Sequence, residues 1–254
     1  MKGSWRDRVR PWVPRPMLAA YRRLRRAGEN GAATTDAGTV DFELPVAPLA
    51  QLFPGADSLE VLFPAAEICR TRDMVLPLAD LLSLAAICRQ LRPRRVFEFG
   101  TYTGSTTLLL AMNTPDDCEI ITLDLPGEAI RKHFRFPYES GCRFRNRPVA
   151  PKIRQLIGYS GSFDHGPYEG TIDLVYVDAD HEYTAVKQDT ETAFRLLAPR
   201  GVIVWDDYVW LPEHSMCAGV TRCLNELNQT KPCHQLEGTR LAVYRAPPAP
   251  PFDD

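Results

Sequence analysis

A short glycine-rich segment between an apolar strand pattern and an apolar helix pattern most constrains how this chain folds. Residues 95–99 (RVFEF) have the composition of a buried strand, and residues 105–112 (STTLLLAM) predict a helix that begins at Ser105. Between them, Gly100 and Gly104 flank three residues in the loop GTYTG. Glycines at such a junction let a ligand approach the backbone, and the helix N-terminus offers unpaired amide groups. The segment therefore predicts a βα unit whose loop binds a ligand.

The same alternation of strand and helix patterns continues along the chain. A helix with a buried apolar stripe is predicted before the loop, on Leu78, Leu81, Leu82, Ala85 and Cys88. Further strands and helices are predicted at residues 119–124, 153–158, 172–177, 182–197, 201–206 and 219–227. Two short strands follow closely, near residues 234–236 and 241–244. We expect an α/β fold: a doubly wound, mostly parallel seven-stranded sheet with helices on both faces and a terminal antiparallel hairpin.

Charge is distributed unevenly between the N-terminal segment and the rest of the chain. Residues 1–26 contain nine Lys or Arg and one acid, out of 30 basic and 32 acidic residues in all. The remainder is acidic, which argues against nucleic acid as a partner and favours a small molecule. The basic segment is either a solvated helix or a contact for a membrane surface or a protein. We expect a basic arm and linker at 1–41, a principal domain at 42–245 and a disordered proline-rich tail at 246–254.

Cysteine usage and hydropathy bear on the compartment of the protein. The seven cysteines lack CxxC spacing, and no stretch has the pattern of a secretory signal or a membrane span. We expect a reduced, cytoplasmic location, with attachment at the membrane periphery as an alternative. The adjacent Cys233 and His234 lack a second ligand pair, so they do not predict a zinc site. The oligomeric state is left open.

Two acids beside the glycine loop narrow the identity of its ligand. Asp124 ends the second predicted strand, 20 residues after Gly104, where a carboxylate binds the ribose hydroxyls of an adenosine cofactor. Glu98 would repel a pyrophosphate but suits an ammonium or sulfonium group. The sequence therefore predicts S-adenosylmethionine (SAM) as the cofactor. The predicted cofactor-binding residues here are Glu98, Gly100, Thr101, Tyr102, Gly104, Ser105 and Asp124.

Acidic segments also end the next two predicted strands, with the sequences VDADHEY and VWDDYVW. Because neighbouring parallel strands end at the same edge of a sheet, Asp178, Asp206 and Asp207 are expected to converge there. Three carboxylates suit Mg²⁺, which would acidify a bound substrate hydroxyl, and His181 is placed to accept the proton. Separate strand-end acids are the alternative reading, and Asp180 is either a helix cap or a ligand.

From about residue 75 to residue 245 the chain resembles the class I SAM-dependent methyltransferases, which implies their Rossmann-like fold. Glu98, Gly100 and Gly104 fall on the glycine motif of that family, and Asp124 falls on its ribose acid. Ser160 falls where such enzymes contact the adenine, which adds it to the cofactor-binding residues.

The two acidic segments resemble the metal-dependent O-methyltransferases of the caffeoyl-CoA and catechol type. That resemblance places Asp178, Asp206 and Asp207 at the metal-ligand positions and His181 at the position of a catalytic lysine. Histidine for lysine and Asp207 for asparagine are departures. Both are better matched by bacterial O-methyltransferases of sugar and natural-product pathways, in which DxDH and a strand-end DY recur.

These resemblances imply methyl transfer from SAM to a hydroxyl of a small molecule or glycan, assisted by Mg²⁺, with His181 and Asp178 as catalytic residues. Three alternatives stay open. The first is a metal-independent N- or C-methyltransferase, the second a non-catalytic cofactor-binding module, and the third a nucleotide oxidoreductase.

A few further residues carry weaker expectations. The basic insertion at residues 131–152 is either a solvated loop or a clamp for an acidic substrate. Trp205, Tyr208 and Trp210 form either an aromatic wall of the substrate site or part of the core. His214 lies in a loop that is placed to cover the substrate.

Overall fold

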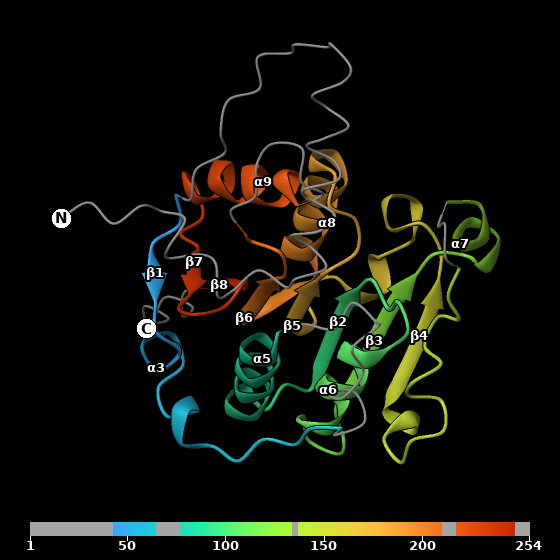
Figure 1. Cartoon of the computed structure of the whole chain (residues 1–254), viewed down its shortest axis with the longest axis horizontal. Coiled ribbons are helices and arrows are strands. Elements are labelled where there is room, and N and C mark those ends of the chain that lie inside the picture. Colours follow the sequence, from blue (N-terminus) through green and yellow to red (C-terminus); the bar gives the residue numbers. More distant parts are fainter. Residues whose placement is uncertain (1–42, 65–76, 134–136, 210–216, 247–254) are drawn as a thin grey trace, which may run out of the picture.

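The computed structural model describes residues 43–64, 77–133, 137–209 and 217–246, which build one eight-stranded sheet with helices on both faces (Figure 1). The strand order is β1-β7-β8-β6-β5-β2-β3-β4. The expectations for the basic arm, the C-terminal tail, Trp210 and His214 lie outside the described residues.

The parallel strands are those that the apolar patterns predict. They are β2 (Arg95–Phe99), β3 (Glu119–Asp124), β4 (Ile153–Ile157), β5 (Ile172–Val177) and β6 (Leu197–Trp205). Strand β8 (Ala242–Arg245) runs antiparallel to both β6 and β7 (His234–Leu236), which confirms the terminal hairpin. The eighth strand, β1 (Val46–Ala47), pairs parallel with β7 and was not predicted, because two residues are too few to show a period.

Helices cover the two faces of the sheet in separate pairs (Figure 1). On one face lie α5 (Leu78–Leu91) and α6 (Ser105–Met112), and on the other α8 (Tyr183–Leu196) and α9 (Ala218–Asn228). Strand residues alternate accordingly: Val96 packs with the α5 side, and Phe97 and Phe99 pack with the α8 side. The shorter helices are α3 (Leu49–Leu52), α7 (Gly127–His133) and single turns at Ala56–Ser58, Ala150–Lys152, Ser160–Ser162 and Gly166–Tyr168.

The buried face of α5 differs from the predicted stripe. Leu78 and Leu82 are 52% and 41% exposed, whereas Leu84 and Ile87 are fully buried. The helix is apolar on most sides, so periodicity alone did not select the face that meets the sheet. Asp80, in the first turn of this helix, is fully buried, which requires a partner for its charge.

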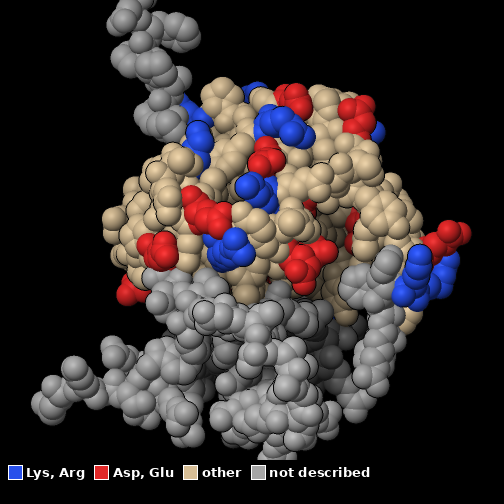
Figure 2. Space-filling view, turned by 90° about the horizontal axis from the view of Figure 1, so that it is seen from above, with Lys and Arg blue, Asp and Glu red and all other residues tan. Residues whose placement is uncertain are grey.

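The surface and the helix lengths give two further observations. Within the described ranges, every helix is too short or too polar to cross a bilayer. Basic and acidic side chains are interspersed over the face shown in Figure 2, without a broad area of one sign among the residues coloured there.

Candidate active site

Backbone contacts join the ends of the central strands. The N–H of Asp178 donates to Phe99 O at 3.0 Å, and the N–H of Asp206 donates to Val177 O at 3.1 Å. Gly100, which has φ +90°, lies so close to Asp178 that a Cβ atom there would overlap the Asp178 carbonyl. The glycine loop and the first acidic segment are therefore packed backbone to backbone.

The loop itself bends sharply before α6. Gly104 (φ 89°) is the N-cap residue of that helix, and Tyr102 holds a left-handed conformation with φ 48°. The Thr101 side chain is buried, and its hydroxyl lies 2.6 Å from the Thr122 hydroxyl. Because this hydroxyl is paired inside the protein, Thr101 is available to a ligand mainly through its backbone. Ser105 begins α6, as predicted.

Glu98 lies deeper than a direct cofactor contact requires. Its side chain is 0% exposed, and Oε2 accepts hydrogen bonds from Thr107 at 2.5 Å and Thr122 at 2.6 Å. Oε1 is buried without a hydrogen-bond partner, and burial raises the pKa of Glu98 to about 8. Glu98 therefore links the strand to the start of α6 through Thr107. Its contact with an ammonium group stays a prediction.

Asp124 is bound by hydroxyl groups from the insertion. It is 7% exposed, and it accepts hydrogen bonds from Ser140 Oγ, from Tyr138 OH at 3.1 Å and from Leu125 N at 2.9 Å. Burial raises its pKa, and these hydrogen bonds oppose the rise. Two of the hydrogen bonds to the predicted ribose acid thus come from side chains outside the glycine motif.

The expectation of a solvated insertion is wrong for the segment that provides these hydroxyls. The N–H of Gly141 donates to Tyr102 O at 2.9 Å, and the N–H of Arg143 donates to Thr103 O at 3.0 Å. Arg143 Nε also donates to the Thr103 hydroxyl at 2.9 Å, and the side chain is only 9% exposed. The Tyr102 and Tyr138 rings pack at 4.5 Å. This part of the insertion therefore packs on the glycine loop and donates hydrogen bonds to it.

Ser160 follows β4, beside the end of β3. The N–H of Gly158 donates to Asp124 O at 2.9 Å, which places the turn that begins at Ser160 close to the predicted ribose acid. A hydrogen bond from Ser160 stabilises the buried carboxylate of Asp189, whose pKa burial nevertheless raises to about 6. The contact of Ser160 with an adenine ring stays a prediction.

The structure brings the three strand-end aspartates together, as the strand order predicts. Carboxylate oxygens of Asp178, Asp206 and Asp207 lie within 4.8 Å of one another. Burial and repulsion from Asp207 raise the pKa of Asp206 to about 8, and burial and Asp206 raise that of Asp178 well above its ordinary value. Asp206 Oδ1 is buried without a hydrogen-bond partner. The raised pKa values and the unpartnered oxygen indicate that the negative charge of the cluster is only partly compensated.

Arg240, in the turn between β7 and β8, is a site residue that the sequence analysis missed. Its guanidinium contacts Asp207 Oδ1 at 2.7 Å, Asp206 Oδ2 at 3.2 Å and Asp80 Oδ2 at 3.0 Å. Together with the nearby His181, this contact lowers the pKa of Asp207, although burial acts in the opposite direction. The available signal was Asp80, an acid within an apolar helix pattern, because such a charge needs a buried partner.

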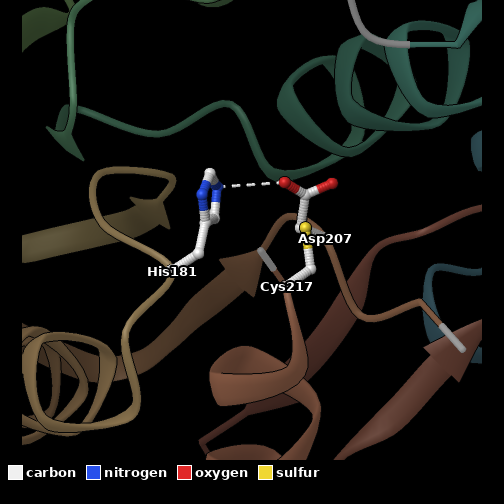
Figure 3. A group of neighbouring side chains, drawn as sticks. All are labelled: His181, Asp207 and Cys217. Carbon is white, nitrogen blue, oxygen red and sulfur yellow. Dashed lines mark ion pairs between the residues drawn. The ribbon is translucent and has the colours of Figure 1, made fainter. Parts of the chain in front are cut away.

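His181 lies beside the acidic cluster and faces Asp207 (Figure 3). Its Nε2 is 3.0 Å from Asp207 Oδ2, and this carboxylate raises the pKa of His181 although burial opposes the rise. Cys217, just before α9, adds its sulfur to the same group within 4.8 Å. A Cβ atom on Gly219 would overlap His181 O, so the start of α9 packs tightly against the loop that carries the histidine. Asp207 has φ 60°, an uncommon conformation for a residue other than glycine.

The structure also shows the surroundings of three further residues that the sequence singled out. Trp205 and Tyr208 are both fully buried, and the Tyr208 hydroxyl accepts a hydrogen bond from Leu44 N at 3.0 Å, so both belong to the core. Asp180 Oδ1 accepts a hydrogen bond from Glu182 N at 2.9 Å, immediately before α8. Asp180 thus closes the turn that leads into α8, whose N-cap residue is Glu182, and a role of Asp180 as a ligand stays a prediction.

Comparison with known proteins agrees with this geometry. Residues 97–208 match a family described as a methyltransferase domain. The caffeoyl-CoA O-methyltransferase of Stellaria longipes is 26% identical over 161 residues, which cover 60% of this chain and 65% of that enzyme. The flavonoid 3',5'-methyltransferase of Vitis vinifera is 25% identical over 137 residues, covering 54% and 57%. The chain thus spans less than two thirds of the length of these relatives.

Solved structures show the same fold at lower identity. The O-methyltransferase TomG of Streptomyces achromogenes, involved in tomaymycin synthesis and solved with SAM, has a TM-score of 0.54 at 19% identity, covering 78% of this chain and 96% of its own. The SAH-bound methyltransferase PaMTH1 of Podospora anserina has a TM-score of 0.53 at 19% identity, covering 92% and 97%. With the glycine loop, these findings show that residues 97–208 match a methyltransferase domain and that the fold around them is that of solved SAM- and SAH-bound methyltransferases.

Proposed function

We propose that this protein transfers the methyl group of SAM to a hydroxyl of a small molecule or a sugar, with the help of a divalent metal ion. The observation that carries the proposal is the convergence of Asp178, Asp206 and Asp207 within 4.8 Å, directly beside the glycine loop. An oxygen acceptor is further supported by the relatives, which are named O-methyltransferases.

In this proposal the loop positions the cofactor, which supplies an electrophilic methyl group when bound. Gly100 and Gly104 permit close approach to the backbone, and Asp124 accepts hydrogen bonds from the ribose hydroxyls. Asp124 already accepts from Ser140 and Tyr138, so a bound ribose shares or replaces these partners. Glu98 Oε1, which has no hydrogen-bond partner, could contact a cationic ligand if the glycine loop moved enough to expose it.

His181 is the proposed general base, and Asp207 is its positioning partner. Because Nε2 faces Asp207 at 3.0 Å, the proton of the acceptor hydroxyl would be taken at Nδ1. The carboxylate then stabilises the resulting imidazolium. Most of the rate acceleration would come from holding acceptor oxygen and methyl group in line.

The acidic cluster fits a hard cation. Three buried acids, Asp80, Asp206 and Asp207, contact the guanidinium of Arg240, Asp178 lies beside two of them, and Asp206 Oδ1 lacks a partner. A metal ion bound by Asp178, Asp206 and Asp207 would supply the positive charge that acidifies a substrate hydroxyl.

Arg240 also favours a second candidate, methyl transfer without metal to nitrogen, carbon or oxygen. Its guanidinium already contacts two of the three aspartates and neutralises part of their charge. In that case Asp206 and Asp207 would serve the architecture of the site instead of binding an ion.

The two candidates separate in one assay, the formation of S-adenosylhomocysteine by the purified chain with panels of phenols, sugars and amines. Metal-assisted O-methylation predicts turnover with a hydroxylated acceptor that EDTA abolishes and Mg²⁺ restores. Turnover that survives EDTA would remove the metal from the mechanism. Cofactor binding without turnover on any acceptor would favour a non-catalytic module.

The base is tested by His181→Gln, with His234→Gln on β7 as the control. We expect the His181 variant to lower kcat by about 10²- to 10⁴-fold with little change in SAM affinity, since general base catalysis contributes that much. The control should keep its rate, and equal rates for the two variants would exclude His181 as the base.

A further inference from the structure

We propose that His181, Asp207 and Cys217 form a second metal site, which takes thiophilic divalent ions such as Zn²⁺ and withdraws His181 from catalysis when filled. Metal binding at this site stands independently, whereas its inhibitory effect rests on the proposed function. The adjacent Cys233 and His234, the pair considered from the sequence, are not part of it.

The three side chains already have the arrangement that a metal ion requires. One ligand atom from each lies within 4.8 Å of the others, and His181 Nε2 is 3.0 Å from Asp207 Oδ2. Zinc bonds of about 2.0–2.3 Å place ligand atoms roughly 3–4 Å apart, so small side-chain rotations would complete the set. Figure 3 shows the imidazole facing the carboxylate, with the cysteine beside Asp207.

A second observation concerns the histidine alone. His181 Nε2 is a buried atom, and the contact that the structure gives it is Asp207 Oδ2 at 3.0 Å. A buried ring nitrogen in this position can donate its lone pair to an ion held between it and Asp207.

Ligand chemistry separates this site from the aspartate cluster. Asp178, Asp206 and Asp207 offer only oxygen, which suits Mg²⁺, whereas nitrogen, sulfur and oxygen together suit Zn²⁺. Asp207 belongs to both sets and contacts Arg240 through Oδ1 and His181 through Oδ2. One residue therefore links the occupancy of the two sites.

The surrounding backbone holds the three ligands in place. Cys217 is 2% exposed and directly precedes α9, and Gly219 in the first turn of α9 packs against the backbone of residues 181–183. Asp207 holds its left-handed conformation at the end of β6. The ligands come from three segments that touch one another, so no large rearrangement is needed to bind an ion.

The test uses the full chain with Co²⁺ and Zn²⁺ as probes and compares Cys217→Ser with Cys223→Ser. Cys223 is also a buried cysteine, within α9 itself, and lies outside the ligand group, so it is the matched control. All proteins carry Cys142→Ser, because Cys142 is the exposed cysteine of the described residues. Co²⁺ reports a sulfur ligand by thiolate charge-transfer absorption, and Zn²⁺ affinity is measured by competition with a chromophoric chelator.

We expect the charge-transfer absorption in the parent and in Cys223→Ser, and its loss in Cys217→Ser. Zn²⁺ affinity should fall by more than about 10-fold in Cys217→Ser and in His181→Asn, since even residues outside the ligand shell cost that much. Absorption that persists in Cys217→Ser, or equal Zn²⁺ affinities in the two serine variants, would overturn the site.

Inhibition is measured within each variant as the ratio of methyl transfer with and without Zn²⁺, at constant Mg²⁺. Zn²⁺ should inhibit the parent and Cys223→Ser and should inhibit Cys217→Ser at least about 10-fold less effectively, in line with the weaker binding. Equal inhibition of all three would refute the inhibitory role. If no acceptor is methylated at all, the proposed function fails, and the spectra and affinities still decide the metal site.

Discussion

On the cofactor side of the carboxyl edge, at the ends of β2 to β4, the buried carboxylates of Glu98 and Asp124 accept hydrogen bonds from hydroxyl groups of the chain. On the acidic side, at the ends of β5 and β6, three aspartates face one another and a single guanidinium. In the first arrangement neutral hydroxyl groups hydrogen-bond both acids, although burial raises the pKa of each. In the second, burial and mutual repulsion raise the pKa of Asp178 and Asp206, so the ionised form of the cluster depends on cations, from the chain or from solution.

This difference separates a part of the site that is organised in advance from a part that ligands must complete. Neutral hydroxyl donors fix the glycine loop whether or not a cofactor is bound. Repulsion among the opposed carboxylates instead lowers the free energy of unfolding, and a cation that binds only the folded state raises it again. The predictions below test whether the two sides respond as differently as their chemistry requires.

The largest effect is expected for Arg240→Met on the acidic side. Removing the guanidinium leaves the buried Asp80 and Asp206 without a positive partner and leaves Asp207 with His181 alone, which should lower the free energy of unfolding by about 3–5 kcal/mol. Urea denaturation measures the change. The control is Arg222→Met, which breaks an exposed pair with Glu226 and should cost less than about 1 kcal/mol.

A second variant distinguishes repulsion among the carboxylates from a general failure to fold. Adding Asp80→Asn to Arg240→Met removes one of the unpaired charges and should recover part of the lost stability. If both substitutions together are as unstable as the sum of their separate effects, repulsion among carboxylates is not the cause.

The next effect concerns the junction of the two sides. Gly100→Ala should lower the free energy of unfolding by more than about 2 kcal/mol, because φ is +90° and the new Cβ overlaps the Asp178 carbonyl. Gly170→Ala isolates the backbone term, since φ is +67° there but no atom lies within 4 Å of the new Cβ, and about 1 kcal/mol is expected. Similar losses in both would show that the junction is not tightly packed.

On the cofactor side, Asp124→Asn should act on affinity more than on folding. Losing a charged acceptor of ribose hydrogen bonds costs about 1.5–3 kcal/mol, or roughly 10- to 150-fold in the Kd for S-adenosylhomocysteine by calorimetry. Asp164→Asn, an exposed acid elsewhere, provides the control. Unchanged affinity in the first variant would mean that Asp124 serves only to anchor Ser140 and Tyr138.

The smallest effect is expected for Ser140→Ala. Asp124 keeps its hydrogen bonds from Tyr138 and Leu125, and the loss of one net hydrogen bond of about 1 kcal/mol is offset by a carboxylate that is more accessible to ribose. The Kd for S-adenosylhomocysteine should change by less than about 3-fold. A loss of affinity as large as that of Asp124→Asn would assign Ser140 itself to the cofactor site.

The fold was predictable from the sequence wherever one period dominates. The apolar runs of β2, β3 and β5, together with the glycine loop, gave the strand bounds, and parallel topology then placed Asp178 next to Asp206. The burial of Leu78 and Leu82 was predicted wrongly because α5 is apolar almost all round, so only the sheet decides which face it covers.

The site was predictable only for residues at strand ends. Arg240 lies in a turn that carries no motif, 160 residues from Asp80, and only the folded sheet brings the two together. Ser140 and Tyr138 were hidden for the same reason, within an insertion whose basic composition is typical of a solvated loop. The roles of His181 and of the three aspartates stay predictions until activity and metal binding are measured.

The order of the aspartates and Arg240 along the sequence has a consequence for synthesis. The aspartates at the ends of β5 and β6 are made before the turn between β7 and β8, which provides their only contacting guanidinium among the described residues. A nascent chain that has not yet reached residue 240 lacks the guanidinium that contacts Asp206 and Asp207. The turn between β7 and β8 therefore completes the charge balance of this edge of the sheet.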